Sequence, residues 1–159
     1  MSPDLIEACF RLGLATAIGA AIGLNRDLHG KPAGLRTHAL IALGSALIVL
    51  SSGHLAGAGD FHAADAQSRV IQGLITGIGF LGAGVILHKP SESRVHGLTT
   101  AAAIWVAALL GAACGAGVFL PVLVASALLA VILLFGGRFE RAIHRRLRPS
   151  SPSTPSQDS

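Results

Sequence analysis

Five long apolar runs, separated by short polar stretches, set the pattern of this chain. They cover Leu5–Leu24, Thr37–Leu55, Val70–Leu87, Leu98–Gly115 and Val118–Phe135. Each run is close to the ~20 residues that an α-helix needs to cross a hydrocarbon core of ~30 Å. The pattern therefore predicts an all-α membrane protein, built as a bundle of about five transmembrane helices.

The last two runs form one stretch without any charged residue, from Leu98 to Phe135. As a single helix this stretch would be ~57 Å long, which is about twice the thickness of the core. We therefore expect it to fold back on itself, with Gly115, Gly117 and Pro121 marking the turn.

Composition supports the membrane class. Only 13% of the 159 residues are charged, whereas soluble domains average about 25%. The net charge is +4, but the basic residues flank the apolar runs and gather in the tail, which does not resemble a nucleic-acid footprint. The expected surroundings are the lipid bilayer, and no nucleic-acid partner is expected.

Loop charges predict the orientation. The second loop carries one basic residue, Arg69, and the fourth carries none, whereas ten lie in the first loop, the third loop and the tail: Arg26, Lys31, Arg36, Lys89, Arg94, Arg138, Arg141, Arg145, Arg146 and Arg148. Because Lys and Arg accumulate on cytoplasmic loops, we expect the N-terminus outside and the C-terminus in the cytoplasm. We expect a transmembrane domain over residues 1–137 and a basic tail over 138–159, ending in a disordered Ser/Pro-rich segment. The arginines of this tail are expected to anchor the topology, or else to form a short basic helix on anionic head groups.

A polar island between the first two runs, Gly23–His38, carries most of the functional expectations. It reads GLNRDLHGKPAGLRTH. We expect Asp27 to pair with Arg36 across the loop, and Thr37 to cap the second span. His38 is expected to be a hydrogen-bonded anchor at the interface, with a proton or metal role as the alternative.

Two further polar groups lie at the ends of other spans. Thr99 and Thr100 open the fourth span, where hydroxyl groups satisfy free backbone N–H groups. Glu7 and Arg11 lie four residues apart with the acid first, the favourable order for a helical ion pair. We favour a structural pair, with a transport site as the alternative.

The third run is dense in glycine. Its GIGFLG segment matches GxGxxG by letter, but a dinucleotide site needs a preceding strand and an acid about 20 residues later, and Glu92 comes too early. Helix packing is the expected role, at the centre of the bundle or on a face between two copies, for Gly73, Gly77, Gly79, Gly82 and Gly84. Weaker signals of the same kind are the GxxxG pairs Gly19/Gly23, Gly53/Gly57 and Gly111/Gly115.

Neither a metal centre nor a catalytic site is expected, and no cofactor. The seven histidines include no pair at i,i+4 spacing, and no nucleophile lies beside a base. None of the eight acidic residues lies in the middle of a span, whereas a Mg²⁺ path requires oxygen ligands. This favours a non-enzymatic interaction protein over an ion transporter, although a homo-oligomer would have backbone carbonyls or Asp27 available for a ring.

Three blocks of the chain resemble the MgtC/SapB family of bacterial inner-membrane proteins. They are GLNRD…GKPAGLRTHALIALG (Gly23–Gly44), RVIQGLITGIGFLGAGVIL (Arg69–Leu87) and VHGLTTAAAIWVAALLGAACGAG (Val95–Gly117). The resemblance covers nearly all of residues 5–135 and implies a five-span inner-membrane fold linked to growth under Mg²⁺ limitation. The family is often labelled a Mg²⁺ transporter, while some members regulate membrane energetics through a partner such as the ATP synthase.

The resemblance also implies which positions carry function: Arg26, Arg36, Thr37, His38, Arg69, Gly97, Thr99 and Thr100. The polar ones among them, with Asn25 and Asp27, form the predicted polar surface: Asn25, Arg26, Asp27, Arg36, Thr37, His38, Arg69, Thr99 and Thr100. Asn25 stands where the family usually has an acid, which weakens a cation site there. Longer members carry a soluble C-terminal domain, whose sensing is expected to be lost here or supplied by another protein. We expect a regulator of Mg²⁺ homeostasis acting through a membrane partner, with a homo-oligomeric transporter of Mg²⁺ or another ion as the alternative.

Overall fold

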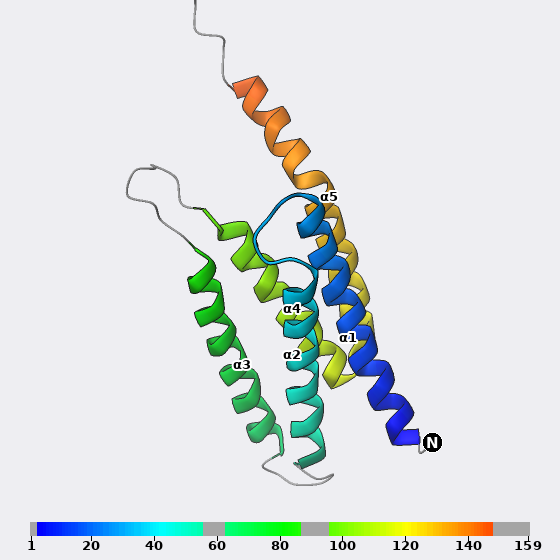
Figure 1. Ribbon diagram of the computed structural model, residues 1–159. Coiled ribbons are helices and arrows are strands. Elements are labelled where there is room, and N and C mark those ends of the chain that lie inside the picture. Colours follow the sequence, from blue (N-terminus) through cyan, green and yellow to red (C-terminus); the bar gives the residue numbers. More distant parts are fainter. Residues whose placement is uncertain (1–2, 56–62, 87–95, 148–159) are drawn as a thin grey trace, which may run out of the picture. The chain divides into compact units, whose positions relative to one another are not determined.

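The computed structural model describes residues 3–55, 63–86 and 96–147. Within these residues it contains five α-helices: α1 (Pro3–Leu28), α2 (Leu35–Leu55), α3 (Ala63–Val85), α4 (Leu98–Ala116) and α5 (Phe119–Leu147) (Figure 1). All five are long and apolar enough to cross a membrane. The predicted all-α, five-helix architecture is therefore confirmed, while the orientation of the termini stays a prediction.

Some helices extend beyond the apolar runs that predicted them. α3 begins at Ala63, ahead of the expected Val70, and α5 continues through the arginine-rich segment to Leu147. Hydropathy detects only the part of a helix that suits hydrocarbon, and a helix can continue past it into the head-group region. The expected fold-back is confirmed at Gly117, whose left-handed backbone (φ 77°) ends α4, a conformation that glycine adopts at little cost.

Glycines bring α1, α2 and α4 into close contact. A Cβ added at Gly111 would collide with the main chain of Ala42, and one at Gly115 with that of Ala46. On α1, Gly19 lies in the same way against the carbonyl of His38. Small residues permit this approach of backbones where water supplies no hydrophobic drive. Two of the three GxxxG pairs are therefore packing sites. Gly53 of the third meets nothing within 4 Å, and its partner Gly57 lies outside the described residues.

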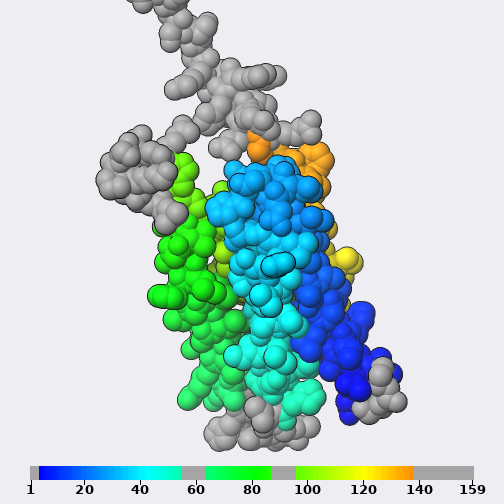
Figure 2. Space-filling model, viewed as in Figure 1, coloured from blue at the N-terminus to red at the C-terminus, as the bar shows by residue number. Residues whose placement is uncertain are grey.

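α3 packs on the edge of this core, where Ile78 forms a cluster with Ile104 and Ala108 of α4. Figure 2 shows α2 between α3 and α1 on one face of the molecule. Of the five glycines predicted to pack α3, only Gly82 has a neighbour, Ala101; the others meet nothing within 4 Å: Gly73, Gly77, Gly79 and Gly84. Their expected place at the centre of the bundle is wrong, because these four glycines are exposed and only Gly82 is buried. A face between two copies stays a prediction.

Contacts divide the chain into a unit of residues 1–126 and a unit of residues 127–159. The first unit includes the start of α5, where the Phe119 ring packs edge-on against Phe10 with 5.4 Å between centroids. The described part of the second unit is the rest of α5, which exposes large apolar side chains: Leu128, Val131, Ile132, Leu134 and Phe135. The predicted boundary between residues 1–137 and 138–159 stays a prediction.

Candidate functional site

The polar island folds into a tight loop between α1 and α2. The N–H groups of Gly30 and Lys31 donate to the carbonyls of Asp27 and Arg26, each at 3.0 Å. Gly30 has a φ of 59°, the left-handed conformation that closes the C-terminal end of a helix. The loop therefore places Arg26 and Asp27 in the last turn of α1, close to the start of α2.

Asp27 caps α2 from outside that helix. Its Oδ2 accepts the N–H of Leu35 at 2.9 Å, and so satisfies one of the free N–H groups at the start of α2. The carboxylate lies where a Cβ on Gly34 would stand, which explains the glycine. Arg36 is exposed and forms no ion pair with the described residues. The predicted Asp27–Arg36 pair is wrong, and so is the Thr37 cap, because Thr37 lies inside α2.

Arg26 is a buried cation, with only 4% of its surface exposed. Its Nη2 donates to the hydroxyl of Thr100 at 2.5 Å and so joins α1 to the first turn of α4. The Nε of Arg26 is buried without a partner, and no carboxylate of the described residues pairs with it. A buried charge without a counter-charge is costly, so this position is a candidate for function.

Thr100 has a different role from the predicted cap. The cap position of α4 is Gly97 in a left-handed conformation (φ 90°), and no side chain caps the helix. Thr100 is 2% exposed and its hydroxyl accepts from Arg26, whereas Thr99 is exposed. The predicted hydroxyl cap is wrong, because α4 begins at the left-handed backbone of Gly97 and no side chain donates or accepts a capping hydrogen bond there.

His38 is fully buried on the face of α2 that packs in the core. Its Nδ1 lies 3.0 Å from the carbonyl of Gly34. A carbonyl only accepts hydrogen bonds, so Nδ1 carries the proton and Nε2 of the neutral ring carries a lone pair. This Nε2 has no partner, and neither has the buried hydroxyl of Ser45, two turns along the same face.

We call Arg26, His38 and Thr100 the buried polar cluster. Of the other residues predicted to share a surface with it, Asn25 is half-buried, and Asp27, Arg36, Thr37, Thr99 and Arg69 are exposed. Arg69 lies two residues after Gln67, which lines a cavity with Arg11 and Gly115 at the opposite end of α1. Arg26 and Arg69 therefore lie at opposite ends of the helices, and the prediction that they share one surface is wrong. Hydropathy identifies the helices but does not reveal which of their ends meet.

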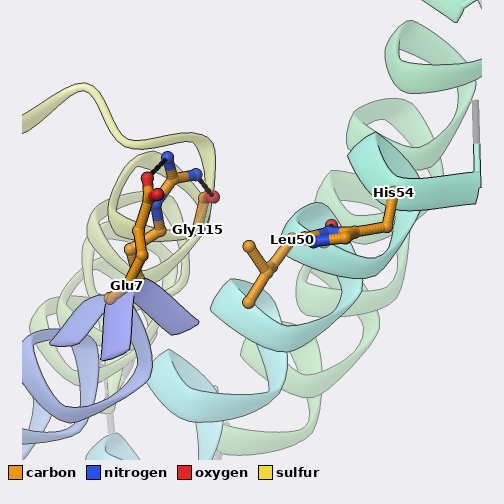
Figure 3. Close-up of polar contacts among 5 residues, drawn as sticks. Glu7, Leu50, His54 and Gly115 are labelled. Carbon is orange, nitrogen blue, oxygen red and sulfur yellow. Dashed lines mark hydrogen bonds and ion pairs between the residues drawn. The ribbon is translucent and has the colours of Figure 1, made fainter. Parts of the chain in front are cut away.

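Arg11 holds the opposite end of the core together. Its guanidinium pairs with the carboxylate of Glu7, as predicted, and also donates to the carbonyl of Gly115 at 2.8 Å (Figure 3). That carbonyl belongs to the last turn of α4, where carbonyls lack helical partners and a cation is favourable. The contact with α4 has no signal in the sequence. Within the described residues, no three His, Cys, Asp or Glu side chains come together to hold a metal ion.

Comparison with known proteins identifies the family of the chain. A model of the MgtC family matches residues 12–142. The chain is 48% identical over 122 residues to SrpB of Synechococcus elongatus, covering 73% of this chain and 67% of SrpB. It is 44% identical to YhiD of Escherichia coli K12, named as a candidate magnesium transporter, over 71% of this chain and 53% of YhiD. It is 41% identical to MgtC of Salmonella typhimurium over 70% of this chain and 45% of MgtC.

The chain spans about half of YhiD and two thirds of SrpB. No solved structure matches it. The match covers α2, α3 and α4 completely and most of α1 and α5, and it includes the buried polar cluster. The chain is therefore a multi-pass membrane protein that belongs to the MgtC family.

Proposed function

We propose that this protein is a regulator of Mg²⁺ homeostasis in the bacterial inner membrane, which acts on a membrane partner and catalyses no reaction. Its relatives support the link to Mg²⁺, since one of them is named as a candidate magnesium transporter. The observation that carries the regulatory role is the buried guanidinium of Arg26, hydrogen-bonded to Thr100.

A fixed positive charge inside the bundle disfavours a cation path. Two unit charges 4 Å apart repel each other by about 4 kcal/mol at an effective dielectric constant of about 20, and a divalent ion doubles this repulsion. No described carboxylate forms an ion pair with Arg26. Close packing of Gly111 and Gly115 on the main chain of α2 leaves little room between these helices. A single chain is therefore poorly suited to conduct Mg²⁺ past Arg26.

The same geometry suits a docking surface that communicates with α4. Asp27, Arg36 and Thr37 are exposed above the buried polar cluster, where a partner has access to them. Arg26 stands next to Asp27 in the chain and is bonded to Thr100 on α4. A partner that moves the end of α1 would thus also act on the first turn of α4.

A second candidate function is transport of Mg²⁺ or another ion by several copies of the chain. The name of YhiD supports it, as does the unpacked glycine face of α3, which offers a place for a second copy. In such an assembly the path would run between copies and avoid Arg26.

The proposal is tested by growth at limiting Mg²⁺ of a strain from which the gene has been deleted. Arg26→Gln and Thr100→Val should fail to restore growth, while Lys31→Gln, which removes an exposed charge from the same loop, should restore it. Immunoblots of the membrane fraction separate loss of function from loss of protein. Full growth with Arg26→Gln at normal abundance would remove the buried polar cluster from the mechanism.

The partner is tested with a photo-crosslinking amino acid at Thr37, which is exposed beside the cluster. One membrane protein should be captured in a fixed ratio, and Arg26→Gln should reduce the yield although it lies outside the contact. A crosslinking yield that is unchanged in the Arg26→Gln variant would argue against communication between the cluster and the surface.

A further inference from the structure

Two adjoining cavities lie at the end of the first unit where α1 begins and α2 and α4 end. The larger has a volume of about 320 Å³ and the smaller one of about 80 Å³. They share Arg11, Leu50 and His54 in their walls. Figure 3 shows His54 and Leu50 on α2, across from Glu7 and Gly115.

The larger cavity offers hydrogen-bond donors and, among its described lining residues, no carboxylate. The Nε of Arg11 is buried and lacks a partner, although both terminal nitrogens are engaged. His54 donates Nδ1–H to the carbonyl of Leu50 at 2.9 Å, so Nε2 of the neutral ring is a hydrogen-bond acceptor, and the ring lines both cavities. Gln67 adds a side-chain amide. Donors around a cation suit the oxygens of a phosphate group.

The smaller cavity has the opposite chemistry. Two of its lining residues are the carboxylates Asp4 and Glu7, three positions apart and hence on one side of α1. Asp4 pairs with no cation of the described residues, and Glu7 shares its charge with Arg11. A carboxylate that is free of a partner suits an ammonium group.

We propose that the two cavities together bind the head group of a zwitterionic phospholipid of the phosphoethanolamine type. The phosphate occupies the larger cavity against Arg11 and Gln67, and the ammonium group occupies the smaller one against Asp4, Glu7 and Nε2 of His54. Donors and acceptors are thus separated in the protein as the two charges are separated in the lipid. This binding site is independent of the proposed regulatory function.

The depth of the site favours a lipid over a soluble ligand. Gly115, which binds Arg11, is one residue from the end of α4, so the cavities lie at the ends of the membrane-spanning helices, near the level of the head groups. From Gln67, positions at i+4 spacing continue along one face of α3. They are Ile71 and Ile75, which are 38% and 39% exposed. These side chains offer an apolar strip for an acyl chain.

Native mass spectrometry of the purified full chain tests the proposal. The protein is offered an equimolar mixture of dioleoyl lipids with phosphoethanolamine, phosphocholine and phosphoglycerol head groups. Retention should be highest for phosphoethanolamine and lowest for phosphoglycerol, which has no ammonium group, by about tenfold. Phosphocholine should lie between them, because it keeps the charge but lacks N–H donors.

Variants assign the site to the two cavities. Asp4→Asn and His54→Leu should each reduce the preference for phosphoethanolamine over phosphoglycerol, because each weakens the contacts with the ammonium group. Both side chains are exposed, and in the described part of the chain neither bonds to another helix. These variants should therefore fold, unlike Arg11→Ala, which also removes the bond to α4. Lys31→Gln, at the other end of α1, should retain lipids as the unmodified protein does.

Two results would overturn the proposal. One is equal retention of the three lipids, or a preference that survives both Asp4→Asn and His54→Leu. The other is displacement of the lipid by free phosphoethanolamine at similar concentration, which would make the ligand a soluble one. Free phosphoethanolamine should bind at least about tenfold more weakly, because it has no acyl chains to bury.

Discussion

Arg26 on α1 and Thr100 on α4 are 74 positions apart in the sequence and share a buried hydrogen bond of 2.5 Å. The bond lies at the end of the core where the polar island joins α1 to α2. It is the only hydrogen bond that the guanidinium makes within the described residues, and the neighbouring Nε is left without a partner. The interaction therefore couples the loop end of α1 to the first turn of α4.

Removal of the Thr100 hydroxyl, which accepts the hydrogen bond from Arg26, should destabilise the protein more than replacement of Thr100 by serine. Thr100→Val keeps the shape but leaves a buried cation unsatisfied, at a cost of about 1–3 kcal/mol, whereas Thr100→Ser keeps the hydroxyl. The free energy of unfolding in detergent, followed by the loss of helical circular dichroism, should fall for the valine variant alone. Equal stability of the two variants would mean that the hydrogen bond does not contribute.

Alanine substitutions at two glycines, Gly111 of α4 and Gly77 of α3, should have opposite effects on the free energy of unfolding. Gly111→Ala should destabilise the protein by about 1–3 kcal/mol, because its Cβ collides with the main chain of Ala42 and overpacking strains the core. Gly77→Ala meets nothing within 4 Å and should gain about 0.5–1 kcal/mol from the higher helix propensity of alanine. Unfolding of both variants in the same detergent measures the difference. Loss of stability in Gly77→Ala would place its face against a second copy.

The role of Asp27 as a cap predicts that it acts independently of Arg36. Asp27→Ala should cost about 0.5–2 kcal/mol, the usual effect of a lost N-terminal cap, whereas Arg36→Gln, an exposed change, should stay within about 0.5 kcal/mol. In a double-mutant cycle with charge reversals the two effects should add, with a coupling energy near zero. If the double reversal instead recovered part of the stability lost in the single variants, the Asp27–Arg36 ion pair predicted from the sequence would be present after all.

The number and nature of the helices were predictable because hydropathy reports on one helix at a time. The apolar runs gave all five spans, and the acid-first spacing gave the Glu7–Arg11 pair. The extension of α3 to Ala63 was not predictable, since its first two turns mix alanines with Asp65, Gln67, Ser68 and Arg69 and so lack the continuous apolar character of a span.

The partners across helices were not predictable, because a single sequence does not say which helix faces meet. Thr100 looks like a cap from its position at the start of a span, yet it bonds to Arg26. The glycines of α3 look like packing sites, yet it is Gly111 and Gly115 that lie on α2. Likewise, Asp27 has a basic neighbour in the loop but a better partner in the free N–H of Leu35.

The central claim is that the chain regulates and does not conduct, and uptake of ²⁸Mg²⁺ into liposomes that contain the purified protein tests it most directly. With a Mg²⁺ gradient and a proton gradient applied in turn, uptake should equal that of empty liposomes, both for the unmodified protein and for Arg26→Gln. Uptake above this background by the unmodified protein, abolished by a substitution at Asp27 or Arg36, would contradict the claim and establish transport.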